Sequence, residues 1–410
     1  MLESSEIRSK AIGAVTRRGL LKAATALAAV PARRASAQQA GQIVAYVGAY
    51  TDRGRGIHMF YLSPSDGTLT PWKVLTGLPS PSSLAFHPNN RYLYAINEIS
   101  NFGGQRDGSA TSIRVDPATG DLQIMNVVST GSPGPAHVAV DAAGQYVFAA
   151  NYGGGTVTVF PIRADGSLGP ATDVEPITGT NRGVQPAQLA PPGSFAISGH
   201  DAPHAHMAHL DPSGRFLLLT DLATDRIYIF RFDRATGTLT PNIPGFVQAY
   251  SGSGPRHFEF ASNGRFLYSL NEESSTIDFM SWNGERGELI IQQTESTLPA
   301  GYEGTNYSSA ILLARDGRFV YCGNRLHDTV AIFALDPLDG WMRYVGEVWT
   351  RGSYPRDFKI DPTGQFMYVL HSRSDNLTTF RVDTSTGNLT FTGKYTGVGN
   401  PSSIAFLTLT

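Results

Sequence analysis

The sequence of 410 residues contains a single cysteine, Cys322, so the chain can form no intrachain disulfide. It also lacks any run of helical periodicity outside the N-terminal region, which excludes a helical bundle and favours an all-β protein. Cys322 lies in a strand-like apolar segment, residues 319–323. We therefore expect it to pack in the core rather than to act as a nucleophile.

Positive charge is scarce beyond the first 37 residues. Those residues hold seven Lys/Arg and two Asp/Glu, which leaves 25 Lys/Arg against 32 Asp/Glu, a formal charge of −7, for the rest of the chain. An acidic domain of this kind excludes nucleic acid as the expected partner.

The N-terminal residues follow the plan of an export signal. Arg17 and Arg18 precede two leucines, a weakly apolar run over residues 23–30 and a small-x-small cleavage pattern. The apolar run is too short to span a bilayer, and the paired arginines resemble the twin-arginine export signal of bacteria. The alternative is a disordered basic tail. We predict a signal peptide over residues 1–37 and a mature chain, periplasmic or secreted and free of the membrane, that begins near Gln38.

One hairpin pattern recurs along the chain. In residues 253–272, two apolar runs of strand character flank Asn263 and Gly264, and Asn-Gly between such runs is the strongest short-range hairpin signal. Six segments share this plan: residues 83–98, 137–151, 206–221, 256–272, 311–324 and 356–371. Further strands follow each copy, which gives units of four strands, as in the blades of a propeller.

A seventh copy is divided between the two ends of the sequence. Residues 43–50 resemble a second strand without its first, and residues 402–407 resemble a first strand without its second. If these two strands pair, the ring closes and its exposed edges disappear. We therefore predict an all-β, seven-bladed β-propeller over residues 38–410, closed by pairing of the N- and C-terminal strands and monomeric. A pair of β-sandwiches fits the sevenfold repeat less well.

Polar residues gather where each hairpin begins and ends. Antiparallel pairing brings these two ends to the same rim, near the central channel of a propeller. The starts of the first strands, which we call the entrances, supply His137, His204, His206, Arg256, His257 and Arg356. The ends of the second strands, which we call the exits, supply Asn97, Glu98, Asn151, Asp221, Asn271, Glu272, Asn324, Arg325 and His371. Some of these groups are expected to line a solvated channel without any further role.

Two arginines stand out within this set. Arg256 and Glu272 lie eight residues before and after Gly264, so a guanidinium and a carboxylate should meet at the rim. An isolated pair of this kind would be structural. Arg356 holds the equivalent entrance but faces His371 instead of a carboxylate, which leaves it free to clamp an anion. Arginines, a histidine and a glutamate together suit acid–base chemistry on an anionic substrate.

A histidine cluster over residues 200–209 raises the question of a metal, since imidazoles are common zinc ligands. The period of two in a strand places His204 and His206 on one face and His209 on the other. We therefore predict no metal and no other cofactor. One histidine is expected to carry a proton instead, because imidazole titrates near neutral pH.

The chain resembles the seven-bladed β-propeller lactonases of the 6-phosphogluconolactonase type, which are also similar to fungal carboxymuconate-lactonizing enzymes. The resemblance spans about residues 43–407 and is carried by residues 97–98, 135–141, 150–155, 203–206, 254–257, 271–272, 296–299, 324–325 and 355–358. It implies an active site of His206, Arg256, Glu272 and Arg356. Around them we expect His204, His257, Asn151, His137 and Arg325 to contact the substrate.

Three functions follow as hypotheses. The first is a metal-independent lactone hydrolase for a small anionic lactone or carboxylate, in which Glu272 and His206 act as base and acid in either order. The second is a cycloisomerase that closes a muconate-type diacid to a lactone. The third is a non-catalytic propeller that binds a ligand or a protein at its rim, because the fold alone does not define an activity.

Overall fold

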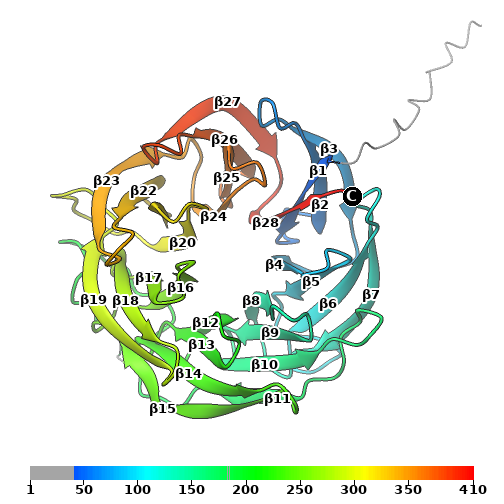
Figure 1. The fold of residues 1–410 in the computed structure, drawn as a ribbon, viewed down its shortest axis with the longest axis horizontal. Coiled ribbons are helices and arrows are strands. Elements are labelled where there is room, and N and C mark those ends of the chain that lie inside the picture. The colour runs from blue at the N-terminus through cyan, green and yellow to red at the C-terminus, as the bar shows by residue number, and fades with distance from the viewer. Residues whose placement is uncertain (1–40, 182, 184) are drawn as a thin grey trace, which may run out of the picture. The chain divides into compact units, whose positions relative to one another are not determined.

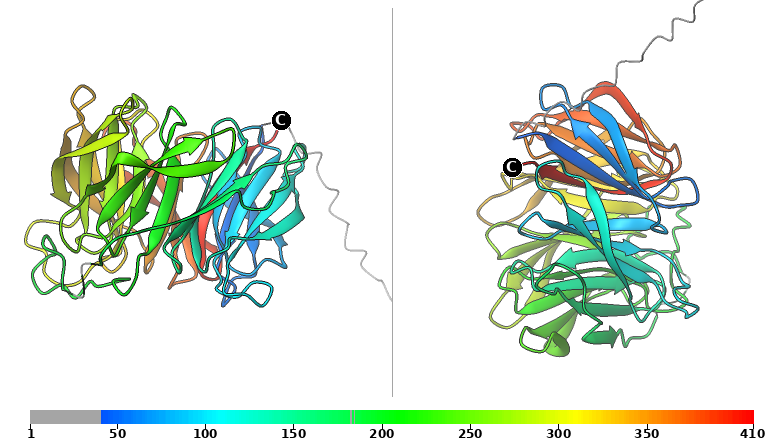
Figure 2. Two further views of the ribbon diagram at one scale, coloured as in Figure 1. Left: turned by 90° about the horizontal axis from the view of Figure 1, so that it is seen from below. Right: turned by 90° about the vertical axis from the view of Figure 1, so that its right-hand side faces the viewer.

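The computed structural model describes residues 41–181, 183 and 185–410, so the predicted signal peptide lies outside the described residues. The described chain forms 28 β-strands in seven four-stranded sheets and contains no α-helix. Figure 1 shows the sheets as blades of a ring, with one strand of each blade innermost, and Figure 2 shows the same blades from two sides. No helix among these residues could cross a membrane. The predicted all-β, seven-bladed propeller is confirmed.

The strands occupy four concentric positions. The innermost strands are β28 (Pro401–Thr408), β4 (Pro81–Phe86), β8 (Pro135–Val140), β12 (Ala205–Leu210), β16 (Pro255–Phe260), β20 (Ser308–Leu313) and β24 (Pro355–Ile360). The second strands are β1 (Ile43–Ala49), β5 (Tyr92–Asn97), β9 (Tyr146–Asn151), β13 (Phe216–Asp221), β17 (Phe266–Asn271), β21 (Phe319–Asn324) and β25 (Phe366–His371).

The two outer positions complete each sheet. The third strands are β2 (Ile57–Leu62), β6 (Ser109–Val115), β10 (Thr156–Pro161), β14 (Arg226–Asp233), β18 (Thr276–Asn283), β22 (Thr329–Leu335) and β26 (Asn376–Val382). The outermost strands are β3 (Leu69–Leu75), β7 (Leu122–Ser129), β11 (Asp173–Pro176), β15 (Thr238–Gln248), β19 (Glu288–Ser296), β23 (Met342–Trp349) and β27 (Leu389–Gly397).

The ring closes as the sequence predicts. Strand β28 pairs antiparallel with β1, with Val44 opposite Leu407 and Tyr46 opposite Ala405. The last residues of the fold thereby complete the first blade, and no open sheet edge is left at the junction.

Turn chemistry explains why each hairpin forms where it does. Asp211 Oδ1 accepts hydrogen bonds from the backbone N–H groups of Arg215 and Phe216, both at 2.9 Å, and Asp361 holds the equivalent turn in the same way. The turn residue Gly264 has φ +65°, a conformation that favours glycine. Polar side chains and glycines thus fix the registers of strands whose apolar residues then face the neighbouring blades.

The core lies between the blades, where buried apolar residues from adjacent sheets interdigitate. Buried tyrosines on the second strands connect neighbouring blades, because each hydroxyl donates to a glycine carbonyl in a turn of the next blade. The pairs are Tyr46 to Gly120, Tyr94 to Gly166, Tyr268 to Gly340, Tyr321 to Gly387 and Tyr368 to Gly67, at 2.7–3.0 Å. Cys322 is fully buried in the same kind of layer, and burial raises the pKa of its thiol, so its predicted packing role is confirmed.

Candidate active site

A cavity of about 700 Å³ occupies the central channel, bordered by the innermost strands. Each innermost strand carries a β-bulge near its start. In β16, for example, Pro255 pairs with Asn271 and His257 pairs with Leu270, which leaves Arg256 between them without a partner. A bulge re-aims the side chain of its extra residue, and here that side chain belongs to the site.

The seven bulges form a ring, which we call the bulge ring. Its members are Ser402, Ser82, Ala136, His206, Arg256, Ser309 and Arg356. Serine and alanine occupy the three consecutive blades that begin with β28, β4 and β8, whereas β12, β16 and β24 supply His206, Arg256 and Arg356. The ring therefore has a functional side and, opposite it, a side with room for a ligand.

A second ring, the exit ring, consists of the residue that follows each second strand. Its members are Tyr50, Glu98, Tyr152, Leu222, Glu272, Arg325 and Ser372. Antiparallel pairing places each of them beside the start of the innermost strand of its own blade. The two rings together contain all four residues that the family resemblance implies for catalysis.

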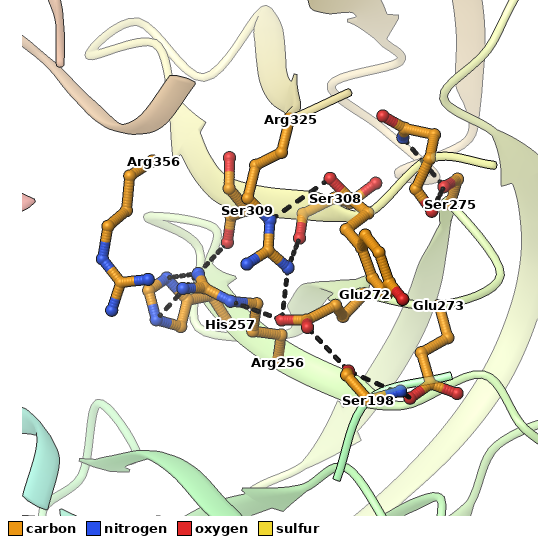
Figure 3. Close-up of polar contacts among 12 residues, drawn as sticks. Ser198, Arg256, His257, Glu272, Glu273, Ser275, Ser308, Ser309, Arg325 and Arg356 are labelled. Atoms are coloured by element: carbon orange, nitrogen blue, oxygen red, sulfur yellow. Dashed lines mark hydrogen bonds and ion pairs between the residues drawn. The ribbon is translucent and has the colours of Figure 1, made fainter. Parts of the chain in front are cut away.

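Glu272 joins two arginines of these rings (Figure 3). Its Oε2 lies 2.9 Å from Nε of Arg256 and 2.6 Å from Nη2 of Arg325, so the predicted pairing with Arg256 is confirmed and a second partner is added. Burial opposes ionisation of this carboxyl, but Arg325 and Arg256 outweigh it and lower its pKa. Arg256 is itself only 1% exposed and also donates to the carbonyl of Ser309.

Arg356 is not the unpaired cation that the sequence suggested. Its Nη2 donates to the hydroxyl of Tyr50 and lies 3.7 Å from Oε2 of Glu98, while the Tyr50 hydroxyl donates to the same Glu98 oxygen at 2.6 Å. The prediction failed because both partners come from other blades. His371, the neighbour expected at the hairpin exit, is fully buried instead and does not border the cavity.

His206 is the imidazole of the bulge ring. It is 6% exposed, and its Nδ1 finds no hydrogen-bond partner among the described residues. Its ring centroid lies 5.0 Å from that of His257, which in turn lies 5.8 Å from that of His137. Burial, reinforced by Arg256 and the other cations, holds the pKa of His206 well below its ordinary value, so this imidazole is neutral at neutral pH.

Three of the predicted substrate contacts, His204, Asn151 and Arg325, do not border the cavity, and Arg325 pairs with Glu272 instead. His137 and His257 border the cavity as expected, but His204 does not: it stacks on Tyr152 at 4.3 Å and bonds to the Tyr152 carbonyl and to Asp201. Asn151 is also outside the cavity. Its side-chain amide donates to the hydroxyls of two threonines of β10, so its role is to fix a turn inside the blade.

The position of His209 also differs from the expected one. His206 and His209 both border the channel, because the bulge at His206 shifts the alternation of β12 by one residue. The prediction that His209 lies on the opposite face from His206 is therefore wrong. Within residues 41–181, 183 and 185–410, no group of three or more His, Cys, Asp or Glu side chains has a geometry that could hold a metal.

Sequence reasoning missed several residues that hold the site. Ser198, in the long connection between β11 and β12, donates from its hydroxyl to Glu272 at 2.8 Å and to Glu273 at 3.0 Å (Figure 3). In the same connection, Nε2 of His200 lies 2.6 Å from Glu273, and this hydrogen bond raises the pKa of the imidazole. The available signal was the length of the connection, because long loops without strands are usually functional.

Tyr50 was missed for a different reason. Tyr50 follows the second strand of its blade, as Glu272 follows the second strand of a different blade. An alignment of the seven hairpins in register would therefore have included Tyr50 among the candidate site residues. The set of hairpin ends predicted from the sequence instead mixed two adjacent positions of each blade. Asn97, Asn151, Asn271 and Asn324 end their strands with buried side chains that bond to the third strand, whereas the next residue in each blade belongs to the exit ring.

The fold and the site together define a seven-bladed β-propeller whose central cavity is bordered by arginines and imidazoles. The family model described as "Lactonase, 7-bladed beta-propeller" matches residues 44–406. The chain belongs to this family of seven-bladed β-propeller lactonases.

Individual relatives support the assignment over nearly the whole fold. A 6-phosphogluconolactonase of Bacillus subtilis is 32% identical over 365 residues, which cover 89% of this chain and 98% of the relative. A 6-phosphogluconolactonase of Formosa agariphila is 29% identical over 370 residues, 88% of this chain and 99% of the relative. Among solved structures, a periplasmic gluconolactonase of Pseudomonas aeruginosa matches with a TM-score of 0.82 and 33% identity, covering 90% of this chain and all of that one.

Proposed function

We propose that the chain hydrolyses a sugar lactone, with His206 as the proton carrier and without a metal. The observation that carries this proposal is a neutral, desolvated imidazole at the wall of the channel cavity, beside two arginines. The names of the relatives, 6-phosphogluconolactonase and gluconolactonase, support an aldonolactone as the substrate class.

In this mechanism His206 transfers the proton, and Arg256 and Arg356 stabilise the developing charge. A water molecule attacks the lactone carbonyl carbon and gives its proton to His206, while Arg256 and Arg356 stabilise the negative charge that develops on the carbonyl oxygen. The ring C–O bond then breaks, and His206 returns the proton to the alkoxide that leaves. The product is the open-chain hydroxy acid.

Glu272 is better suited to hold the arginines than to move a proton. Its Oε2 is occupied by Arg256 and Arg325, and its Oε1 accepts a hydrogen bond from Ser198. A carboxylate whose pKa is lowered is a weak base and is not protonated at neutral pH, so it is not a ready acid either. We therefore assign the base and acid roles to His206 and a positioning role to Glu272.

The direct test is to supply the purified mature protein with glucono-δ-lactone and, separately, with a carboxymuconate. We expect acid release from the lactone well above its spontaneous hydrolysis, and no loss of ultraviolet absorbance from the diene. Loss of diene absorbance would favour the cycloisomerase instead. No turnover of either compound, together with a ligand-dependent rise in Tm, would favour a binding propeller.

The pH dependence follows from the state of His206. Catalysis requires the neutral imidazole, so activity is lost as the pH falls through the pKa of His206, which burial and the nearby cations lower. An ordinary histidine would produce an acid limb near pH 6.5. We expect kcat/KM to stay level down to about pH 6 and to fall only at lower pH; an acid limb centred at 6.5 or above would contradict the assignment.

The export signal adds a proposal about location. The twin-arginine pattern at Arg17 and Arg18, and the periplasmic relative of Pseudomonas aeruginosa, both support export before the chain acts. Replacing both arginines by lysine keeps the charge and should retain the full-length precursor inside the cell. Immunoblots of cell fractions would show this, and a mature-size band outside the cytoplasm from the double variant would refute the twin-arginine route.

A further inference from the structure

A second set of side chains borders the channel further along the innermost strands, on the C-terminal side of the bulge ring. Three residues beyond the bulges, strands β12, β16 and β24 present His209, Glu259 and Lys359 to the cavity. At the same level, β28, β4 and β8 present Ala405, Ala85 and Ala139. We call these six residues the lower ring.

The lower ring repeats the plan of the bulge ring on the same blades. In both rings β12, β16 and β24 carry the functional groups, and β28, β4 and β8 carry small residues that leave space opposite them. Three residues of a strand correspond to roughly 10 Å, so the lower ring lies too far from His206 to serve the same reacting atoms. Between the two rings lie His137, His257 and Asp357.

The chemistry of the lower ring differs from that of the bulge ring. Nδ1 of His209 donates to the carbonyl of Leu210 at 2.7 Å, so its Nε2 is left as an acceptor. Lys359 and His209 are exposed, and Lys359 makes no ion pair within 4.0 Å among the described residues. Glu259 is partly buried, and burial raises the pKa of its carboxyl to about 7, against the opposing effect of Lys359.

These groups supply a cation for a carboxylate and hydrogen-bonding partners for hydroxyls, with Arg315 and Phe406 also bordering the cavity. Lys359 influences the pKa of His209, His137 and Glu259 alike, so the groups share one small volume. The proposed mechanism uses none of the lower ring. The charge of Lys359, the hydrogen-bond acceptors of the lower ring and the space beside its three alanines therefore require another explanation.

We propose that the lower ring is a second binding site for a small polyhydroxylated carboxylate, the chemical class of the ring-opened product. The carboxylate would pair with Lys359, and the hydroxyl groups would bond to Glu259 and His209 in the space beside the three alanines. The choice of this ligand class rests on the proposed lactonase function. The existence of the site rests on the lower ring itself.

The test is isothermal titration of the mature protein with gluconate at pH 7. We expect two binding events for the wild-type protein and the loss of one in each of two variants. Lys359→Met removes the cation at similar length, and Ala405→Leu fills the space without altering a charge. Lys73→Met, on the outer strand β3, is the matched control and should retain both events.

The outcomes of the titration test the second binding site independently of the lactonase activity. Two events in the wild-type protein, one in both lower-ring variants and unchanged Tm values would support the proposal, whether or not the protein turns over a lactone. A single event in the wild-type protein, or two events in either lower-ring variant, would overturn it. If the lactone assay is blank but the binding pattern holds, the proposed function fails and the second site stands.

Discussion

Replacing His206 by Asn is expected to lower kcat for lactone hydrolysis by roughly 10²–10⁴, the usual contribution of a general acid–base group. The side chain is buried at the wall of the cavity, and Asn retains polarity and some volume but cannot carry the proton. KM should change little, because the arginines that bind the substrate are untouched. Initial rates with glucono-δ-lactone, corrected for spontaneous hydrolysis, measure the effect.

The control for this variant is His327→Asn. His327 pairs with Glu347 at 2.9 Å on a different part of the fold and does not border the cavity, so its loss should leave kcat within twofold, or about 0.4 kcal/mol, of the wild-type value. A His206→Asn enzyme with near-wild-type kcat would remove His206 from the mechanism. An equal loss in both variants would indicate general damage to the fold instead.

The second large effect is expected for Glu272→Gln. This change leaves Arg256 and Arg325 in a buried place without their shared carboxylate, and breaking a buried pair from one side costs about 3–5 kcal/mol. Catalysis should fall as well, because mutual repulsion would displace Arg256 from the position in which it faces the substrate. Urea denaturation and steady-state kinetics measure the two losses separately.

Ser198→Ala provides the comparison for Glu272→Gln. It removes one hydrogen bond to the same carboxylate but leaves both ion pairs intact, so we expect a loss of about 1 kcal/mol and a much smaller change in rate. If Glu272→Gln were as stable as the wild-type protein and lost only kcat, Glu272 would be a proton carrier rather than the anchor of the arginines.

The fold could be predicted almost completely from the sequence, because its signals are local. Asn263 and Gly264 specify a hairpin by themselves, and the complementary end segments specify the closure through β1 and β28. The meeting of Arg256 with Glu272 also follows from one hairpin, since the two residues are equidistant from its turn.

What the sequence could not provide are contacts between blades and shifts of register within strands. Tyr50 lies 306 residues from Arg356 in the chain, and its hydroxyl still accepts a hydrogen bond from that guanidinium. The bulge that turns His206 toward the channel also reverses the expected face of His209. Simple alternation cannot anticipate such an insertion, and a shift of one residue separates structural Asn97 from Glu98 at the site.

In the proposed mechanism, arginines and an imidazole open the lactone without a metal. The carboxylates near the channel do not form the oxygen cage that calcium prefers, because Glu98 and Glu272 each lie against an arginine and Oδ1 of Asp221 accepts a hydrogen bond from Thr224. Cations around the same channel would repel a divalent ion. The most direct test is the hydrolysis rate of glucono-δ-lactone after exhaustive chelation. We expect full activity that added calcium does not raise; loss of activity on chelation, restored by calcium, would contradict the metal-independent mechanism.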